Sequence, residues 1–381
     1  MIEKITSERI VTPHGIEKGA IYLKDGKILA VGEMNLPYEK KVNAGDDYVL
    51  PGMIDIHTHG ATGHDYSDSD PDGIIEAIRY SVDHGATSVL PTITSSSYKK
   101  TYTALSNLER AMMDPVYGSR ILGAHLEGPY FSEKQSGAQN KEFITDPKQK
   151  DYERLLDRFG SIILRWDYAP ERDRDGAFCS CLARSGVIPA AGHTDAKYDD
   201  MLVAKKNGCR LITHLYSCTS TITREMGYRK LGVIECAYLW DDLYVEIIAD
   251  GSHLPIELLQ LIFKLKPQDK IILITDSMSV TGTEANSGVL NGVEYLIEDG
   301  VCKLIDRSAF AGSIATARDL MKVCARAGKE AVDIAKMGSE NPASLLGLKK
   351  GRIEVGYDAD IIIATKDYDI KAVYAGGERI R

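Results

Sequence analysis

Pro51-Gly52-Met53-Ile54-Asp55-Ile56-His57-Thr58-His59-Gly60 is the stretch around which the rest of the chain can be organised. Its apolar run predicts a buried β-strand that ends at a glycine. Because successive side chains of a strand point to opposite faces, His57 and His59 share one face. Two imidazoles at the carboxyl end of a strand favour half of a metal site. His-x-His alone is short and common, so a pair of hydrogen-bonded histidines under a turn is the alternative.

Length and composition limit the class of protein. The chain has 381 residues, of which 44% are hydrophobic, and this suits a barrel with an appended domain. The net charge of -9 comes with scattered Lys and Arg, so we expect no nucleic-acid partner, although local donors can still hold an anionic substrate. There is no apolar run of membrane-spanning length and no leader-like segment after Met1. We therefore expect a cytoplasmic protein without a membrane partner.

Eight strand-like segments with helical patterns between them predict the fold of the central part of the chain. The opening stretch is the first segment, and the other seven are 88–94, 120–126, 162–169, 187–192, 210–216, 244–249 and 270–275. Amphipathic helices are expected between many of them, for example at 72–84, 102–113 and 256–265. Eight β–α repeats predict an α/β fold, a closed (β/α)8 barrel. An open doubly wound sheet is the alternative, but no Gly-x-Gly-x-x-Gly turn follows an early strand.

Both ends of the chain carry short alternating apolar runs that are broken by glycines. These runs are 5–11, 19–26, 28–32 and 48–50 near the amino terminus, and 351–356, 359–364 and 370–377 near the carboxyl terminus. Such runs predict antiparallel strands, with a hairpin turn at 24–27. We expect residues 1–50 and 349–381 to form one small β domain together, and residues 51–348 to form the barrel.

Polar residues that suit metal binding recur where the predicted strands end. In a (β/α)8 barrel, the carboxyl ends of all the strands meet at the catalytic face. Beyond the opening pair, the strand ends carry His125, Glu127, His193, His214, His253 and Asp276. Histidines of an ordinary core would be spread over the helices as well, so this concentration favours a metal site.

The residue types at the strand ends suggest how metals would be held. Glu127, His193 and His214 would form a three-ligand site with an open position, as in catalytic metal centres. The opening pair of histidines could complete a second site, with Glu127 bridging. Zinc and iron are favoured, and manganese or cobalt are also compatible with imidazole and carboxylate ligands. His125 shares a face with Glu127 and could support the ligands or pack in the core.

Asp276 is the best candidate for a general base. It follows the eighth strand, opposite strands three to six. A carboxylate at this place can take a proton from water and later donate it to a leaving amine. An Asp that caps the next helix is the alternative reading of Thr275-Asp276-Ser277, but the position at a barrel strand end favours catalysis.

Together, these residues resemble the amidohydrolase superfamily and, within it, the N-acetylglucosamine-6-phosphate deacetylase branch. The matching stretches are 51–60, His125-Leu126-Glu127-Gly128-Pro129, Ala191-Gly192-His193-Thr194, Thr213-His214-Leu215-Tyr216, Ile248-Ala249-Asp250-Gly251-Ser252-His253, Thr275-Asp276, Ala311-Gly312-Ser313 and Asn341-Pro342-Ala343. The match covers nearly the whole chain. The stretches around Glu127 and His253 are more specific to the deacetylase branch than the opening stretch, which marks only the superfamily.

The resemblance implies a barrel with a β-sandwich built from both termini, one or two divalent metals per subunit, and usually a homodimer. It implies Glu127, His193, His214, His57 and His59 as metal ligands and Asp276 as the catalytic acid/base. The implied reaction hydrolyses the acetamide of N-acetyl-D-glucosamine 6-phosphate to D-glucosamine 6-phosphate and acetate, in amino-sugar catabolism. The implied substrate contacts are Ala138, Gln139, Ser217, Cys218, Arg224, Asp250, His253, Phe310, Ala311, Gly312 and Ser313.

Arg224 has two readings in the sequence. It lies beside Arg229 and Lys230 and could be an ordinary surface charge. The resemblance implies that Arg224 and His253 contact the phosphate and the sugar, and arginine suits a bidentate phosphate contact.

Two positions depart from the pattern of the deacetylase branch. The branch usually carries Gly-Ala-His and Asn-Ala-Met where this chain has Gly137-Ala138-Gln139 and Ser217-Cys218-Thr219. Gln139 can still donate a hydrogen bond but cannot carry a charge. These changes concern the substrate, so the alternative substrate is a related N-acyl hexosamine, N-acetylgalactosamine 6-phosphate or an unphosphorylated sugar. Cyclic amide opening, purine deamination, or a binding protein that keeps only the barrel are more distant alternatives.

Overall fold

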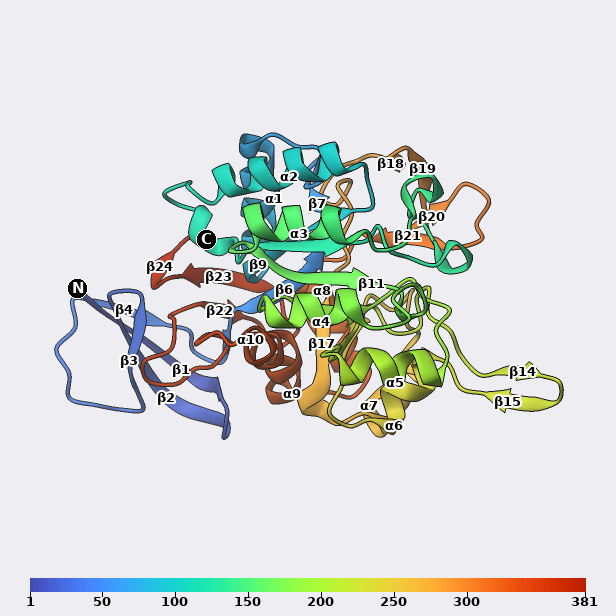
Figure 1. The fold of residues 1–381 in the computed structure, drawn as a ribbon. Coiled ribbons are helices and arrows are strands. Elements are labelled where there is room, and N and C mark those ends of the chain that lie inside the picture. Colours follow the sequence, from blue (N-terminus) through green and yellow to red (C-terminus); the bar gives the residue numbers. More distant parts are fainter.

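The computed structural model describes residues 1–381 and confirms the predicted barrel (Figure 1). Its parallel strands follow one another around the barrel as β6 (Met53–Thr58), β9 (Ala86–Thr94), β10 (Ala124–Glu127), β11 (Ile163–Tyr168), β12 (Ile188–Ala191), β13 (Leu211–Ile212), β16 (Tyr244–Ile248) and β17 (Ile271–Ile274). Two backbone hydrogen bonds close the seam between the last strand and the first. The Asp276 N–H donates to the His57 carbonyl at 2.9 Å, and the His59 N–H donates to the Ser277 carbonyl at 2.8 Å. The open-sheet alternative is therefore excluded.

A helix follows each barrel strand, and these helices surround the sheet (Figure 1). They are α1 (Pro71–Asp83), α2 (Tyr98–Ala111), α3 (Gln149–Phe159), α4 (Ala177–Arg184), α5 (Tyr198–Lys206), α6 (Val233–Leu239), α7 (Ile256–Leu265) and α8 (Ala317–Arg326). The first shows why the sequence folds this way. Asp70 caps α1 by accepting from the Gly73 N–H at 2.9 Å, Pro71 starts it, and Ile74 and Ile78 bury its apolar face.

The barrel interior is apolar at its amino-terminal end. Ile54, Ile188 and Ile272, from three different strands, pack there in one core cluster. The same cluster includes Ala343 and Leu345, so the segment after α8 covers this end of the barrel. That segment consists of α9 (Ala331–Ala335), a π-helix (Lys336–Glu340) and α10 (Asn341–Leu346). The polar residues of the interior consequently lie toward the opposite, carboxyl-terminal end.

Both termini contribute to a second, eight-stranded sheet, as expected. Its strands are β1 (Ile2–Thr12), β2 (Gly15–Lys24), β3 (Lys27–Val31), β4 (Lys40–Asn43), β5 (Tyr48–Pro51), β22 (Ile361–Ala364), β23 (Ile370–Ala375) and β24 (Glu378–Arg379). Antiparallel pairing of Val49 with Ile363 joins the two ends of the chain. The prediction of a strand at 351–356 is wrong, and this segment is irregular. Gly351 and Gly356 have φ of 78° and 84°, a conformation that interrupts extended backbone. The domain boundaries stay a prediction.

Three smaller β units follow barrel strands on the carboxyl-terminal side of the barrel. The predicted hairpin at 292–304 is present and belongs to a four-stranded sheet of β18 (Ser287–Leu290), β19 (Val293–Glu298), β20 (Val301–Leu304) and β21 (Phe310–Ser313). A separate hairpin, β14 (Thr223–Glu225) with β15 (Tyr228–Lys230), projects away from the body of the molecule (Figure 1). A short pair, β7 (Gly60–Ala61) with β8 (His64–Asp65), follows the opening strand.

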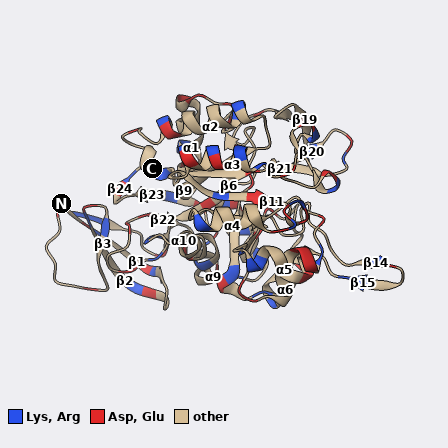
Figure 2. Cartoon of the chain, viewed as in Figure 1, with Lys and Arg blue, Asp and Glu red and all other residues tan.

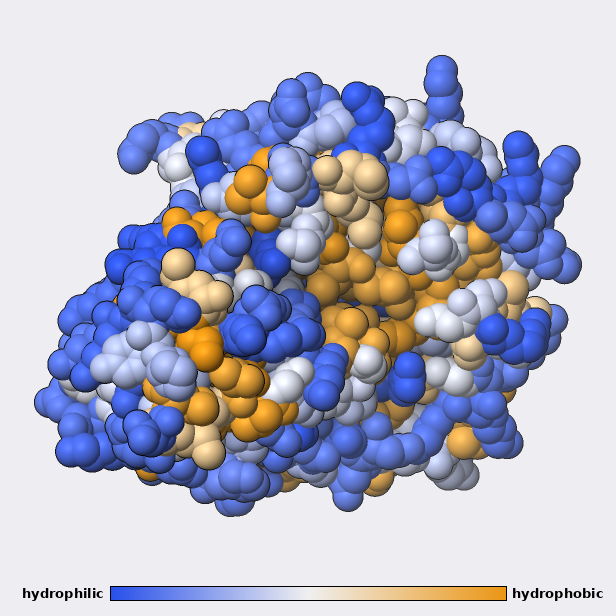
Figure 3. Space-filling model, turned by 90° about the vertical axis from the view of Figure 1, so that its left-hand side faces the viewer, coloured by the Kyte–Doolittle hydropathy of each residue, from blue (hydrophilic) through white to orange (hydrophobic).

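Basic and acidic residues are interspersed along the chain, as Figure 2 shows. Figure 3 shows the side that carries the terminal sheet: hydrophilic residues dominate its rim, and hydrophobic residues gather around a hollow near its middle. No helix is both long enough and apolar enough to cross a bilayer.

Candidate active site

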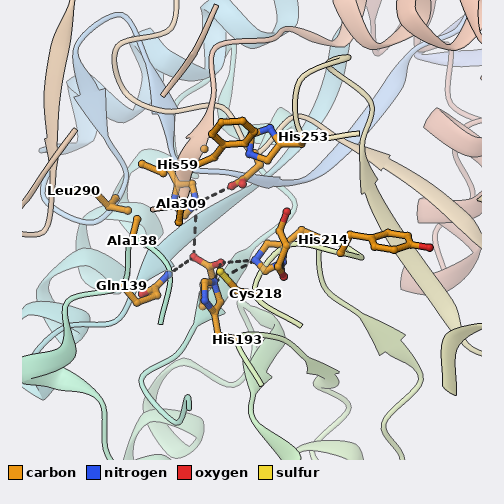
Figure 4. A pocket seen from close by; sticks show the side chains of 16 residues that line it. His59, Ala138, Gln139, His193, His214, Cys218, His253, Leu290 and Ala309 are labelled. Carbon is orange, nitrogen blue, oxygen red and sulfur yellow. Dashed lines mark hydrogen bonds and ion pairs between the residues drawn. The ribbon is translucent and has the colours of Figure 1, made fainter. Parts of the chain in front are cut away.

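A pocket of ≈ 260 Å³ opens at the carboxyl-terminal end of the barrel (Figure 4). It is lined by His59, Glu127, Ala138, Gln139, His193, His214, Tyr216, Ser217, Cys218, His253, Asp276, Leu290, Ala309, Phe310, Ala311 and Gly312. Pockets for drug-sized ligands measure roughly 300–1,000 Å³, so this one suits a small molecule. The sequence prediction named most of these residues but missed Tyr216, Leu290 and Ala309. Apolar and aromatic loop residues carry no signal that would mark them as pocket-lining in a single sequence.

Glu127, His193 and His214 converge on one point of this pocket. Figure 4 labels the two histidines, whose rings lie close together. The Oε1 atom of Glu127 lies 3.1 Å from His193 Nε2 and 3.3 Å from His214 Nε2, and the two Nε2 atoms are 3.2 Å apart. The other ring nitrogens face backbone carbonyls, those of Gln135 at 3.0 Å and Ser217 at 3.1 Å. Each Nδ1 therefore donates a hydrogen, so that a neutral ring would have its lone pair on Nε2, where a cation would bind.

His57, His59 and Asp276 form a second group next to the first. The Oδ1 atom of Asp276 lies 3.4 Å from His57 Nε2 and 3.0 Å from His59 Nε2, and Glu127 lies between the two groups, 3.5 Å from His57 and 3.6 Å from His59. His57 Nε2 and Asp276 Oδ1 are buried and have no hydrogen-bond partner. Buried polar atoms without partners are rare, and a divalent cation coordinated by them would remove the anomaly. The donor set of both groups therefore fits a metal centre.

Burial and charge act against each other at these groups. Burial alone would raise the pKa of Glu127, but the imidazoles of His57, His193 and His214 hold that pKa well below its usual range. Burial alone would lower the pKa of His57, but Asp276 and Glu127 raise it well above its usual value. Burial would also lower the pKa of His193, but Cys218 and Glu127 raise it well above its usual value. Without a cation, the carboxylates of Glu127 and Asp276 therefore favour the protonated form of the His57 ring, and Glu127 favours that of the His193 ring.

These shifts predict that cation binding releases protons. A metal needs neutral imidazole ligands, and near neutral pH the raised pKa values of His57 and His193 keep these rings protonated until a cation displaces the proton. We expect calorimetric titration with Zn²⁺ to give binding enthalpies that depend on the ionisation enthalpy of the buffer, with about one proton or more released per ion. The affinity should also fall as the pH is lowered. Equal enthalpies in two such buffers would contradict the protonated state of the centre.

The backbone at the strand ends turns sharply to aim these side chains. His193, His214 and Asp276 have φ of 46°, 29° and 49°, in the left-handed region that residues with a Cβ rarely adopt. Each such residue costs on the order of 1–3 kcal/mol, and such costs concentrate at functional sites. Three of them at one pocket support a functional role for its geometry.

Gln139 contacts a carboxylate rather than open space. Its Nε2 donates to Glu127 Oε2 at 2.7 Å, and its Oε1 accepts from the Ser95 N–H at 3.1 Å. The backbone at Gly137 lies close to Cys218: a Cβ at Gly137 would be only 2.5 Å from the Cys218 sulfur. Gln139 therefore lines the pocket while it also fixes the orientation of Glu127.

The remaining predicted residues divide into those that the fold brings to the pocket and those that it does not. His253 lines the pocket against the ring of Phe310, at 4.8 Å between ring centroids. Asp250 lies behind it and accepts from His253 Nδ1 at 2.7 Å. Ser313 donates to the carbonyl of Thr275 and so supports the loop of Asp276 rather than facing the pocket.

Two further residues lie outside the pocket. Arg224 is exposed on β14, in the projecting hairpin, and within one chain it does not line the site. His125 is fully buried beneath His57, at 4.5 Å between ring centroids, and burial and Arg165 lower its pKa to about 4. It is therefore a neutral interior residue and not a pocket residue.

Comparison with known proteins agrees with this geometry. A model of the amidohydrolase family matches residues 48–380. The chain is 34% identical to N-acetylglucosamine-6-phosphate deacetylase from Bacillus subtilis (strain 168) over 368 residues, 93% of this chain and 91% of the relative. The enzyme of that name from Vibrio furnissii is 29% identical over 335 residues, 87% of this chain and 82% of the relative.

Solved structures lead to the same family. N-acetylglucosamine-6-phosphate deacetylase from Pasteurella multocida superposes with a TM-score of 0.93 at 25% identity, over 100% of this chain and 99% of the other. A mutant of the Mycobacterium smegmatis enzyme in complex with N-acetyl-D-glucosamine-6-phosphate gives 0.91 at 26% identity, also over 100% and 99%. The predicted resemblance is confirmed: the chain belongs to the amidohydrolase family.

Proposed function

We propose that the protein hydrolyses the acetamide of N-acetyl-D-glucosamine 6-phosphate to D-glucosamine 6-phosphate and acetate, with the help of one or two divalent cations. The observation that carries this proposal is the convergence of Glu127, His193 and His214 with Asp276 on a single small pocket. The similarity to deacetylases over nearly the whole chain supports the choice of substrate. We propose zinc or iron as the cation, since imidazole nitrogen and carboxylate oxygen suit both.

The groups at the pocket suit the steps of amide hydrolysis. A divalent cation, when bound, acts as a Lewis acid on the acetamide carbonyl and makes water more acidic. Asp276 accepts a proton from the attacking water, because His57 and His59, despite its burial, hold the pKa of this carboxyl below its usual value. The same carboxyl then donates a proton to the nitrogen as the amine leaves. His253 and Phe310 bind the sugar side, opposite the ligands.

A hydrolysis screen over phosphorylated and free N-acetyl hexosamines tests the proposed substrate. We expect N-acetyl-D-glucosamine 6-phosphate to have the highest kcat/KM, with acetate and free amine formed in equal amounts. A higher kcat/KM for N-acetylgalactosamine 6-phosphate or for an unphosphorylated sugar would select the alternative substrate, which the Gln139 and Ser217 positions leave open. Loss of all activity on removal of metal with a chelator, and recovery on adding it back, would separate an enzyme from a binding protein.

The phosphate of this substrate needs a cationic partner that the pocket of one chain does not have. No lysine or arginine lines the pocket. Arg224 lies on an exposed hairpin whose apolar side chains Ile222, Met226 and Tyr228 are also exposed. Exposed apolar residues on a projecting segment are typical of contacts between proteins. We therefore propose a homodimer in which this hairpin packs on the second copy and presents Arg224 to the phosphate there.

Removal of Arg224 should then weaken the binding of phosphorylated substrate alone. We expect Arg224→Ala to raise KM for the 6-phosphate roughly 10–100-fold, about 1.4–3 kcal/mol for a charge-assisted contact. The KM of an unphosphorylated analogue should change little. The control is Lys230→Ala, a cation on the other face of the same exposed hairpin, which should leave both values unchanged. Equal losses on both substrates would reject the phosphate role.

Mixing two impaired variants, assayed at a low concentration of the 6-phosphate, distinguishes a contact within one chain from a contact between copies. A dimer of one Arg224→Ala chain and one Asp276→Asn chain contains one complete site if Arg224 acts on the second copy. Such mixtures, formed by refolding or co-expression, should recover a measurable fraction of activity toward the 6-phosphate. No recovery, or a monomer in sedimentation experiments, would contradict the proposed dimer.

A further inference from the structure

A buried ion pair lies in the barrel interior beneath the candidate active site. Arg165 on β11 contacts Asp167 on the same strand at 2.9 and 3.0 Å. It also reaches across the barrel to β16, where its Nη1 and Nη2 both donate to Glu246, the second contact at 3.2 Å. All three side chains are 0% exposed, and none of them lines the pocket. One guanidinium faces two carboxylates, so one carboxylate charge is left to be balanced by a further cationic group.

Glu246 also contacts two of the proposed ligand residues. Its Oε2 accepts from His57 Nδ1 at 3.3 Å and from the backbone N–H of His214 at 3.4 Å. A carboxylate at Nδ1 keeps the hydrogen on that nitrogen, so the neutral ring that a cation requires has its lone pair on Nε2. His57 Nε2 then points toward Asp276 Oδ1 at 3.4 Å, the pair of buried atoms without hydrogen-bond partners.

Stability alone does not explain this arrangement. Replacing a buried ion pair by packed apolar residues is often neutral or stabilising, because the cost of removing charges from water is large. The amino-terminal end of the barrel interior is filled by packed apolar residues. The charged group is found only at the layer directly below the ligand histidines, where its field and its hydrogen bond act on them.

We propose that Glu246, anchored by Arg165, is a positioning residue that holds His57 as an Nε2 ligand and makes the His57–His59–Asp276 group a second cation position. This inference rests on the proposed function only in that the pocket takes divalent cations. The first position, at Glu127, His193 and His214, does not depend on Glu246 side-chain contacts to its imidazoles. The pair beneath the site therefore decides whether the second position fills, and leaves the first position intact.

A competing arrangement uses the same histidine. His57, His125 and Asp167 also lie close enough together to bind a metal, with His125 Nε2 at 3.0 Å from Asp167 Oδ2. That group lies farther from the pocket. Asp167 is already engaged by Arg165 and by the Thr213 hydroxyl, which donates at 2.8 Å. The geometry favours Glu246 over Asp167 as the residue that directs His57.

Metal binding by matched variants tests the inference without any assay of activity. The full-length chain, stripped of metal and titrated with Mn²⁺, should bind two ions and give the exchange-coupled electron paramagnetic resonance spectrum of neighbouring Mn²⁺ ions. Glu246→Gln keeps the shape, so it should retain the first ion and bind the second roughly 10–100-fold more weakly, as for loss of a ligand's hydrogen-bond partner. At one to two equivalents its spectrum should be that of isolated Mn²⁺.

Asp167→Asn is the matched control. It removes an equally buried carboxylate from the same Arg165 but leaves the His57–Glu246 bond in place, so both ions should still bind. Glu246→Asp, which keeps the charge but withdraws it from His57, serves if Glu246→Gln does not fold, and should also weaken the second ion. The inference would be overturned if the wild-type chain bound only one Mn²⁺ ion, or if Glu246→Gln bound the second ion with wild-type affinity. It would also be overturned if Asp167→Asn weakened the second ion more than Glu246→Gln does. A chain that binds two ions as expected but hydrolyses no N-acetyl sugar would reject the proposed function alone.

Discussion

Asp276→Asn should lower kcat by at least ~10²-fold, as expected when a general acid–base is lost, and should leave the cation at Glu127, His193 and His214 in place. The amide of asparagine has almost the shape of the carboxylate but cannot accept the proton of water or return it to the amine. Asparagine also tolerates the left-handed backbone that residue 276 adopts, with φ of 49°. The variant therefore removes the chemistry with little change in structure.

Steady-state kinetics and elemental analysis of the same preparation measure both parts of this prediction. Asp195→Asn is a useful control, because Asp195 also follows a barrel strand but bonds to Lys134 at 2.8 Å, away from the pocket. It should keep the wild-type kcat. A metal-loaded Asp276→Asn enzyme that loses less than about tenfold in kcat would show that another group moves the proton. His125 is not that group, because it is enclosed beneath His57, and His253 would be the next candidate.

Glu127→Ala should have the second large effect, the loss of the more firmly held cation and with it the activity. Glu127 is the one residue whose carboxylate lies within 3.6 Å of all four ligand imidazoles. Loss of a partner that only supports a ligand costs about 10–100-fold in metal affinity, so loss of a ligand itself should cost at least about 100-fold. Equilibrium dialysis with Zn²⁺, followed by elemental analysis, measures this.

Comparison variants separate the two cation positions. Glu127→Gln keeps the shape of the buried side chain but removes its charge, and should also lose affinity, which guards against a loss caused only by unfolding. His57→Asn/His59→Asn should lose part of the metal and keep the rest. Wild-type metal content in Glu127→Ala would contradict the assignment of Glu127 as a metal ligand. Complete loss of metal in the histidine double variant would show that His57 and His59 hold the primary ion.

The sequence by itself determined the features that depend on local periodicity. Alternation along the opening strand placed His57 and His59 on one face, and eight strand–helix repeats were sufficient to predict a parallel barrel. In a parallel barrel, every strand end lies at the same face. Residues as far apart in the chain as Glu127 and Asp276 could therefore be assigned to one site without any knowledge of contacts.

The tertiary structure decided the features that depend on the partners of each side chain. The bond from His57 to Glu246 joins residues 189 positions apart, and the contact of Gln139 with Glu127 depends on the path of a loop. The sequence also could not determine that Arg224 is exposed, because an arginine in a hairpin has the same sequence pattern whether it faces a pocket or solvent. Periodicity fixes the face on which a residue lies, whereas the partner on that face is selected by long-range packing, which no local pattern encodes.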